Sequence, residues 1–202
     1  HPVFVCSKTD KSNAPVRGTC SNLMNLWPIY PEYLHDAFHR AFSEECLKNG
    51  SKRPTEKEWK TELYRLQDDC VTCSHCGEIN FASTCENGVI ECTVCHKKTR
   101  VPCAVAVNGY QVVAGKDKSL SEYHTAYGGR DKLVGNFAES KKTAGVYCLQ
   151  NVSAVIWSVT YPEKPAMTYE PGKTVTLIPG TVIEIGNTKA EVVSAADVKN
   201  IQ

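Results

Sequence analysis

The sequence contains no long run of basic residues and no long apolar segment. Lysine and arginine together number 23, aspartate and glutamate 22, and the formal net charge is +1. Basic pairs such as Lys97-Lys98 and Lys141-Lys142 give no electrostatic reason to expect a nucleic acid as partner. The apolar segments are far too short to cross a bilayer, so we expect a soluble chain without a membrane partner.

We also expect no signal peptide, because His1-Pro2-Val3-Phe4-Val5 has neither a basic start nor a cleavage site. The chain begins on an apolar run without an initiator methionine, which favours a segment cut from a longer protein. Its eleven cysteines are an odd number and do not favour a secreted scaffold of disulfides. We therefore expect a reducing, cytoplasmic location.

Four of the cysteines form two Cys-x-x-Cys pairs, Cys73/Cys76 and Cys92/Cys95, separated by fifteen residues. Two intervening residues let both sulfurs of a pair turn toward one ion, and two such turns (knuckles) complete a tetrahedron at about 2.3 Å per Zn–S bond. The sequence therefore predicts a structural Zn²⁺ ion in a zinc ribbon. A redox dithiol pair and a disulfide staple are the alternatives.

The residues around the two pairs complete the expected ribbon. Gly77 suits the left-handed conformation that a tight knuckle needs, and Asn87-Gly88 predicts a hairpin turn between flanking strands. The expected strand residues are Ile79, Phe81, Val89 and Ile90. The alternative ligands are Cys70 in place of Cys73, then Cys85 and Cys103, while His75 and His96 are expected beside the site.

Two helices are expected before the ribbon. Pro31 begins the first, which carries an apolar stripe and should end near Asn49-Gly50. The stripe consists of Leu34, Phe38, Ala41 and Phe42. Thr55 and Glu58 form a capping box that opens the second helix, in which Trp59 begins the apolar face.

From Val101 onward, short β-rich runs alternate with Gly/Pro turns, which favours a small antiparallel β-sandwich. The expected strands are 104–107, 110–114, 145–149, 155–160, 174–178, 182–185 and 190–193. The predicted fold class is α+β, with a helical part at 1–69, a zinc ribbon at 70–100 and a β-sandwich interaction domain at 101–202.

The first seventy residues resemble the last helices of the C-terminal lobe of a Ser/Thr protein kinase, in a bacterial subset that carries a cysteine-rich ribbon and a β-rich tail. The matching residues are Trp27, Pro28, Tyr30, Pro31, Leu34, Ala37, Phe38, Ala41, Phe42, Lys52, Arg53, Pro54, Thr55, Glu58, Trp59, Leu63 and Leu66. The resemblance implies structural roles for Arg53, Thr55, Glu58 and Trp59. Arg53 would lack its family partner, a glutamate of the activation segment, and would face solvent or pair with Glu44 or Glu58.

A kinase needs a glycine-rich loop over the phosphates, a His-Arg-Asp catalytic loop and an Asp-Phe-Gly metal site, and this sequence contains none of them. The chain by itself is therefore not expected to transfer phosphate. If the resemblance holds, helices cut from a kinase lobe should expose an apolar patch or cover it by dimerising or by packing on the ribbon.

The last hundred residues resemble the late strands of forkhead-associated domains, which bind phosphothreonine. The resemblance rests on 149–153 with Trp157 and on 179–186. It implies a phosphopeptide contact through Asn151 and Ser153, with Arg130 as the nearest counterpart of the phosphate-binding arginine. The family's Ser-Arg-x-x-His element has no counterpart here.

The resulting hypothesis is a non-catalytic regulatory or scaffolding segment of a Ser/Thr kinase, with structural zinc and a protein-interaction β-domain. Its partners would be proteins, such as its own kinase domain, a phosphoprotein or a second copy of the chain. A free-standing zinc-ribbon adaptor that binds nucleic acid is the alternative. A metallohydrolase is excluded if four cysteines fill the zinc coordination sphere.

Overall fold

The computed structural model describes residues 3–126 and 128–198. The chain divides into two compact units, one reaching Gln67 and one starting at Asp68. Helices and several antiparallel sheets are both present, which confirms the predicted mixture of α and β structure. Among the described residues, the helices are too short or too polar for any of them to traverse a bilayer.

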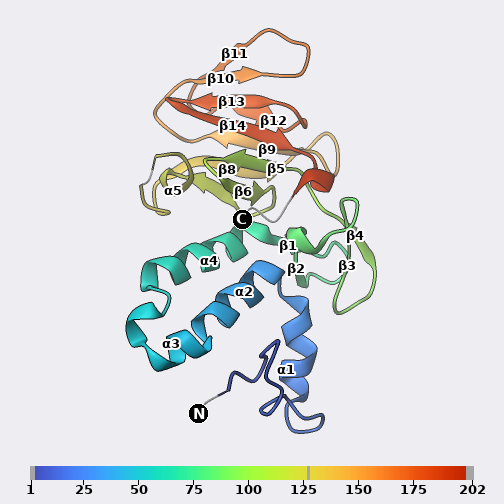
Figure 1. Ribbon diagram of the computed structural model, residues 1–202. Coiled ribbons are helices and arrows are strands. Elements are labelled where there is room, and N and C mark those ends of the chain that lie inside the picture. Colours follow the sequence, from blue (N-terminus) through green and yellow to red (C-terminus); the bar gives the residue numbers. More distant parts are fainter. Residues whose placement is uncertain (1–2, 127, 199–202) are drawn as a thin grey trace. The chain divides into compact units, whose positions relative to one another are not determined.

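The first unit is helical (Figure 1). Its elements are α1 (Ser21–Leu26), η1 (Trp27–Ile29), α2 (Glu32–Ala41), α3 (Glu44–Lys48), η2 (Gly50–Lys52) and α4 (Glu56–Asp69). The last two residues of α4 belong to the second unit.

The predicted helix from Pro31 to Asn49-Gly50 is two helices, so this prediction is wrong. Pro31 precedes α2 in an extended conformation, and α2 ends at Ala41. The Ser43 side chain then accepts a hydrogen bond from the N–H of Cys46 and begins α3. A serine at this N-cap position satisfies a backbone N–H that has no partner inside the new helix. It therefore favours the start of a second helix over the continuation of the first.

The helices of the first unit pack through aromatic side chains. Phe38 of α2 meets Trp59 of α4 edge to face, with ring centroids 5.1 Å apart. Phe4 stacks on Phe42 at 4.8 Å. Nevertheless Phe42 of the predicted apolar stripe remains 42% exposed, and Leu63 of α4 is 53% exposed.

The second unit contains two larger antiparallel sheets (Figure 1). The six-stranded sheet has the order β11-β10-β13-β14-β5-β6, and the four-stranded sheet the order β12-β9-β8-β7. Their bounds are β5 (Ala104–Val107), β6 (Tyr110–Val113), β7 (Ser119–Ser121), β8 (Leu133–Glu139), β9 (Tyr147–Asn151), β10 (Trp157–Thr160), β11 (Met167–Tyr169), β12 (Thr174–Thr176), β13 (Val182–Ile185) and β14 (Thr188–Val193). The unit also contains α5 (Glu122–Thr125) and two short 3₁₀ turns, η3 (Ala82–Thr84) and η4 (Ala195–Asp197).

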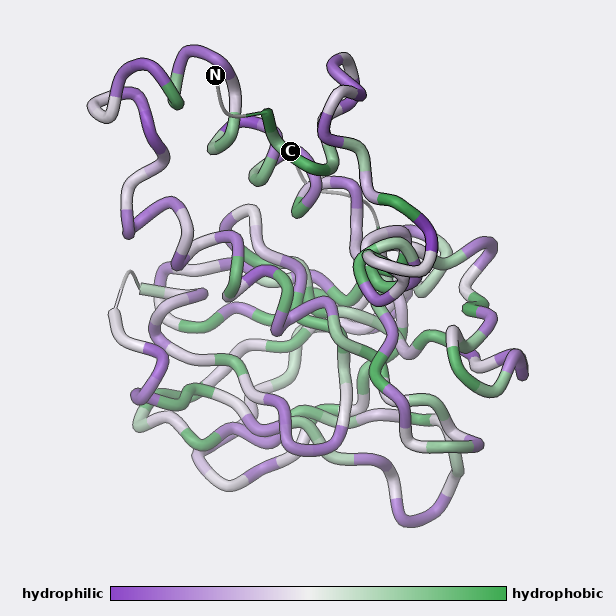
Figure 2. The backbone as a smooth tube through the Cα atoms, turned by 90° about the horizontal axis from the view of Figure 1, so that it is seen from below, coloured by the Kyte–Doolittle hydropathy of each residue, from purple (hydrophilic) through white to green (hydrophobic). Residues whose placement is uncertain are grey.

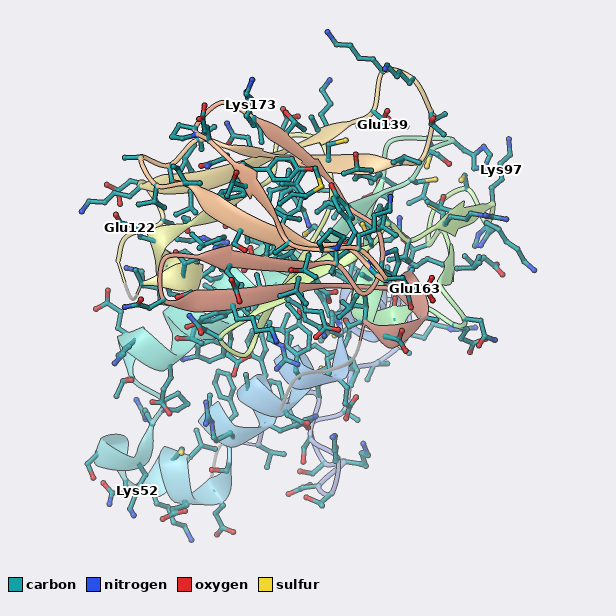
Figure 3. All side chains as sticks on the ribbon, turned by 90° about the horizontal axis from the view of Figure 1, so that it is seen from above. Lys52, Lys97, Glu122, Glu139, Glu163 and Lys173 are labelled. Carbon is teal, nitrogen blue, oxygen red and sulfur yellow. The ribbon has the colours of Figure 1, made fainter. Side chains whose placement is uncertain are left out.

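One buried cluster takes side chains from both larger sheets. Trp157 and Ile183 come from the six-stranded sheet, and Leu149 and Val175 from the four-stranded one. Hydrophobic and hydrophilic residues accordingly alternate along much of the chain in Figure 2, as expected for strands with one buried face. Charged side chains such as Glu139 and Lys173 extend outward from this unit (Figure 3).

The remaining strands form two separate hairpins in residues 70–100, which we call the four-cysteine segment after its two Cys-x-x-Cys pairs. One pairs β1 (Cys70–Thr72) with β2 (Ile79–Phe81), and the other pairs β3 (Val89–Glu91) with β4 (Lys98–Arg100). The Asn87-Gly88 turn is present, with φ of 51° and 75° and a single bridge between Glu86 and Val89. The expected pairing of the strand at Ile79–Phe81 with that at Val89 does not occur, because η3 leads the chain away after Phe81.

Candidate metal centre

One structural unit occurs twice in the four-cysteine segment. The second copy begins nineteen residues after the first. Residues 70–81 form β1, a knuckle and β2, and residues 89–100 form β3, a knuckle and β4. The pairing registers are equivalent, since Val71 opposes Asn80 in the first hairpin and Ile90 opposes Thr99 in the second. Each hairpin therefore presents its Cys-x-x-Cys turn in the same way.

The two knuckles have the same backbone hydrogen bonds. The N–H of Cys73 donates to the carbonyl of Glu78 at 2.7 Å, and the N–H of Cys92 donates to that of Lys97 at 3.0 Å. The residue after the second cysteine is left-handed in both, with φ of 80° at Gly77 and 56° at His96. The positive φ of Gly77 confirms the conformation predicted for this residue. Glycine adopts that conformation without steric cost.

The four predicted sulfurs converge on one point, all within 4.8 Å of one another. Cys73 Sγ lies 3.7 Å from Cys95 Sγ, and Cys76 Sγ lies 3.6 Å from Cys92 Sγ. A tetrahedron with Zn–S bonds of about 2.3 Å has edges of about 3.8 Å, whereas a disulfide bond is about 2.05 Å long. The four cysteines therefore have the spacing of metal ligands and could hold a zinc ion.

The closest alternative ligands have other places. Cys70 begins β1 and lies outside the group of four sulfurs, so Cys73 is the residue paired with Cys76. The thiol of Cys85 is 3.5 Å from the carbonyl of Ala195. Cys103 precedes β5 and packs against the core of the two larger sheets. These three cysteines are not part of the group of four that could hold a metal ion.

The two histidines beside the knuckles are exposed. Nε2 of His75 lies 3.3 Å from the carbonyl of Lys98, and Nδ1 of His96 lies 3.5 Å from a carboxylate oxygen of Glu91. Neither histidine belongs to the group that could hold a metal ion. His75 links the first knuckle to the second hairpin, whereas Lys97 next to His96 extends into solvent (Figure 3).

The environment of the first cysteine of each pair favours the thiolate. Hydrogen bonds from the hydroxyl of Thr99 and the N–H of His75 lower the pKa of Cys73 to about 5. The N–H groups of Cys95 and Val94 lower the pKa of Cys92. A lowered pKa favours the thiolate, which is the deprotonated form that a metal ion requires of a cysteine ligand.

Cys76 behaves differently. The N–H of Glu78 favours its thiolate, but desolvation and the sulfurs of Cys95 and Cys92 outweigh that hydrogen bond and raise the pKa of Cys76 to about 12. Thiolates this close repel one another, so without a cation the group retains protons. A divalent cation at the centre would replace those protons.

Sequence reasoning missed two buried polar residues beside the sulfurs, Asn80 and Thr99, which are 3% and 5% exposed. Nδ2 of Asn80 lies 3.7 Å from Cys92 Sγ, and Oγ1 of Thr99 lies 3.4 Å from Cys73 Sγ. The sequence does contain a signal for these two residues, because Asn80 and Thr99 each lie four residues after the second cysteine of a Cys-x-x-Cys pair. It becomes visible only when the two halves of the four-cysteine segment are aligned.

The residues predicted from the kinase resemblance lie in the first unit. The backbone N–H of Thr55 donates to Glu58 at 2.7 Å, and the N–H of Glu58 donates back to the Thr55 hydroxyl at 3.3 Å, so the capping box is present. Arg53 is exposed and donates through Nε to the carbonyl of Cys46 at 3.1 Å. Glu58 also pairs with Arg40 at 3.5 Å.

The three residues predicted for phosphopeptide binding serve internal contacts. Arg130 forms an ion pair with the buried carboxylate of Asp68. The side-chain amide of Asn151, which is fully buried, donates to the carbonyl of Val155 at 2.8 Å, and its oxygen accepts from the hydroxyl of Ser153 at 2.7 Å. Asn151 and Ser153 thus shape the loop after β9, whereas Arg130 neutralises a buried acid.

Asp68 also belongs to a buried Ser-His-Asp arrangement that sequence reasoning did not find. Nε2 of His124 lies 3.1 Å from Asp68 Oδ2, and Nδ1 lies 3.2 Å from the Ser121 hydroxyl. However, Nδ1 accepts the backbone N–H of Ser121 at 3.0 Å and so closes the capping box of α5. Ser121 and His124 are each 1% exposed, so a substrate has no access to the hydroxyl, and the arrangement is structural.

Comparison with known proteins finds no matching family, no matching curated protein and no matching solved structure.

Proposed function

We propose that this chain is a non-catalytic regulatory and scaffolding segment of a Ser/Thr protein kinase, organised around a structural Zn²⁺ ion. The observation that carries the zinc centre of this proposal is the convergence of four cysteine sulfurs within 4.8 Å. Four thiolates complete a tetrahedron and leave no coordination position for water or substrate. The ion would therefore stabilise structure and would not take part in catalysis.

Zinc in this position would order more than the two hairpins. Val71 and Ile90 of the four-cysteine segment pack in one buried cluster with Val101, Ala104 and Val113. Ala104 and Val113 belong to β5 and β6 of the six-stranded sheet. Metal binding is folding energy in small sites of this kind, so the ion would also support this edge of the sheet.

Kinase parentage is an inference from the motifs of the first unit. The capping box of Thr55 and Glu58 supports it, because the Arg-Pro-Thr element opens the last kinase helix in the family that the chain resembles. The exposed apolar side chains of Leu26, Phe42 and Leu63 also support it. Helices that pack against further parts of a kinase lobe would present such a surface.

We assign protein binding to the β-rich part of the second unit, as a small β-sandwich. Val152, Val155 and Ile156 between β9 and β10 are 38%, 45% and 58% exposed and offer apolar contact area. Candidate partners are the kinase domain of the same protein or a phosphoprotein. Recognition of phosphate by Arg130 would first require its ion pair with Asp68 to break.

Metal content tests the zinc site. We expect one zinc ion per chain, lost in Cys76→Ser and Cys92→Ser and retained in the control Cys70→Ser, which changes the neighbouring cysteine outside the group. Retention of zinc by the first two variants would refute the site. A gel shift with DNA or RNA at low salt tests the adaptor alternative, and nucleic-acid binding there would favour it.

The coding sequence upstream of His1 tests the parentage. An Asp-Phe-Gly motif preceded by His-Arg-Asp is expected there, and a sequence without either would contradict the proposal. The regulatory role is tested by adding the purified chain to the kinase domain encoded upstream. A change in its phosphotransfer rate is expected, and an unchanged rate would oppose a regulatory role.

A further inference from the structure

We propose that Asn80 and Thr99 are positioning residues of the zinc centre, each stabilising a buried thiolate that belongs to the opposite hairpin. The inference rests on the proposed zinc site and goes beyond it, since it assigns a role to two residues that are not ligands.

The charge of the centre creates the need for such residues. Zinc with four thiolates carries a net double negative charge, which requires hydrogen-bond donors wherever water has no access. Cys73 and Cys92 are 2% and 0% exposed, whereas Cys76 is exposed and Cys95 is half-buried. Water can solvate the second cysteine of each pair, but the first cysteine depends on the protein.

Asn80 supplies a donor to the second knuckle from the first hairpin. Its Oδ1 accepts the backbone N–H of Thr93 at 3.1 Å, and because that group can only donate, the amide orientation is fixed. Nδ2 must then face the carbonyl of Glu78 at 3.2 Å and Cys92 Sγ at 3.7 Å. The side chain thus holds both the backbone and the buried sulfur of the second knuckle.

Thr99 supplies a donor to the first knuckle from the second hairpin. Its hydroxyl lies 3.4 Å from Cys73 Sγ. Thr99 and Asn80 are equivalent in the repeat, so the exchange of donors between the hairpins is reciprocal. The two hairpins lie in separate sheets, so no ladder of backbone hydrogen bonds joins them. Asn80 and Thr99 therefore help to align one pair of ligands with the other.

Zinc affinity measured by competition with a chromogenic chelator, on the full chain, tests the proposal. Thr99→Val and Asn80→Leu should each weaken zinc binding by about 10- to 100-fold. Thr99→Ser keeps the hydroxyl and should bind nearly as tightly as the unaltered chain. Thr72→Val makes the same change at an exposed position of β1, where no hydrogen bond to a sulfur is seen, and is the matched control.

Substitution of Co²⁺ for zinc adds a readout that a loss of packing alone would not move. Loss of a hydrogen bond makes a thiolate more electron-rich, so the sulfur-to-cobalt charge-transfer band should shift to lower energy in Thr99→Val and not in Thr72→Val. The inference would be overturned if the zinc affinities of Thr99→Val and Asn80→Leu equalled that of Thr72→Val. It would also be overturned if Thr99→Ser bound zinc as weakly as Thr99→Val. If the unaltered chain bound no zinc, the proposed zinc site would fail first.

Discussion

The buried carboxylate of Asp68 compensates the charge of Arg130 and orients His124, and its replacement by asparagine tests this role. Asp68 is 4% exposed, accepts from His124 Nε2 at 3.1 Å and forms an ion pair with Arg130. Asparagine preserves the shape but removes the negative charge that Asp68 presents to the Arg130 guanidinium. Removal of one partner of a buried pair costs about 3–5 kcal/mol. We expect Asp68→Asn to lower the free energy of unfolding by about 3 kcal/mol, near the lower limit, because Arg130 keeps some contact with solvent.

Urea unfolding followed by fluorescence and circular dichroism, with zinc saturating, measures this loss. Total stabilities of single domains are about 5–15 kcal/mol, so a loss of this size moves the midpoint clearly. Glu184→Gln is the control, because it neutralises an exposed carboxylate on β13 of the same unit. We expect that variant to stay within about 0.5 kcal/mol of the unaltered chain.

A double-mutant cycle with Arg130→Met separates the ion pair from other effects. Removing both charges should cost less than the sum of the two single changes, because neither partner is then left uncompensated. A strictly additive double mutant, or an Asp68→Asn variant as stable as Glu184→Gln, would refute the reasoning.

Three further predictions concern other parts of the chain. Desolvation lowers the pKa of Lys118 to about 8, so between about pH 8 and 10.5 the folded chain binds fewer protons than the unfolded chain. Its unfolding free energy should therefore rise by about 3 kcal/mol across that range, and Lys118→Met should remove this rise. Gly135→Ala would place a Cβ 2.9 Å from Leu149 Cδ1 and should cost about 1–3 kcal/mol in thermal unfolding, whereas Gly115→Ala, which meets only a flexible side chain, should not. Thr55→Ala should remove about 1 kcal/mol from the first unit by uncapping α4, as measured by helical circular dichroism.

Features set by short-range chemistry could be predicted from the sequence. The spacing of Cys73, Cys76, Cys92 and Cys95 predicted a group of sulfurs that the structure brings together. The Thr55/Glu58 box needed only a three-residue separation. The strands at 104–107 and 182–185 lie where their turn signals placed them.

Features that depend on a distant partner could not be predicted in the same way. Strand β8 contains Gly135, which reads as a break in a strand but lies against Leu149 and Trp157, where a side chain has no room. The short helix α5 is capped by His124 in place of the usual glutamate or glutamine, and that histidine is held by Asp68, 56 residues away.

The pairing of strands in the four-cysteine segment shows a second limit. An Asn-Gly turn between two apolar runs predicts one hairpin, and the turn exists, but the strands pair across the knuckles instead. Each knuckle is itself a hairpin turn, so the sequence contained two competing kinds of turn, the two knuckles and the Asn-Gly turn between them. The buried positions of Asn80 and Thr99 follow from the pairing that forms, and only the repeat reveals them.

X-ray absorption at the zinc edge of the purified chain tests the central claim most directly. The account predicts one zinc ion per chain with four sulfur neighbours at about 2.3 Å, and no lighter atom in the first coordination shell. A shell containing nitrogen or oxygen at about 2.0–2.1 Å, or a chain that purifies without zinc and does not take it up, would contradict the four-thiolate centre.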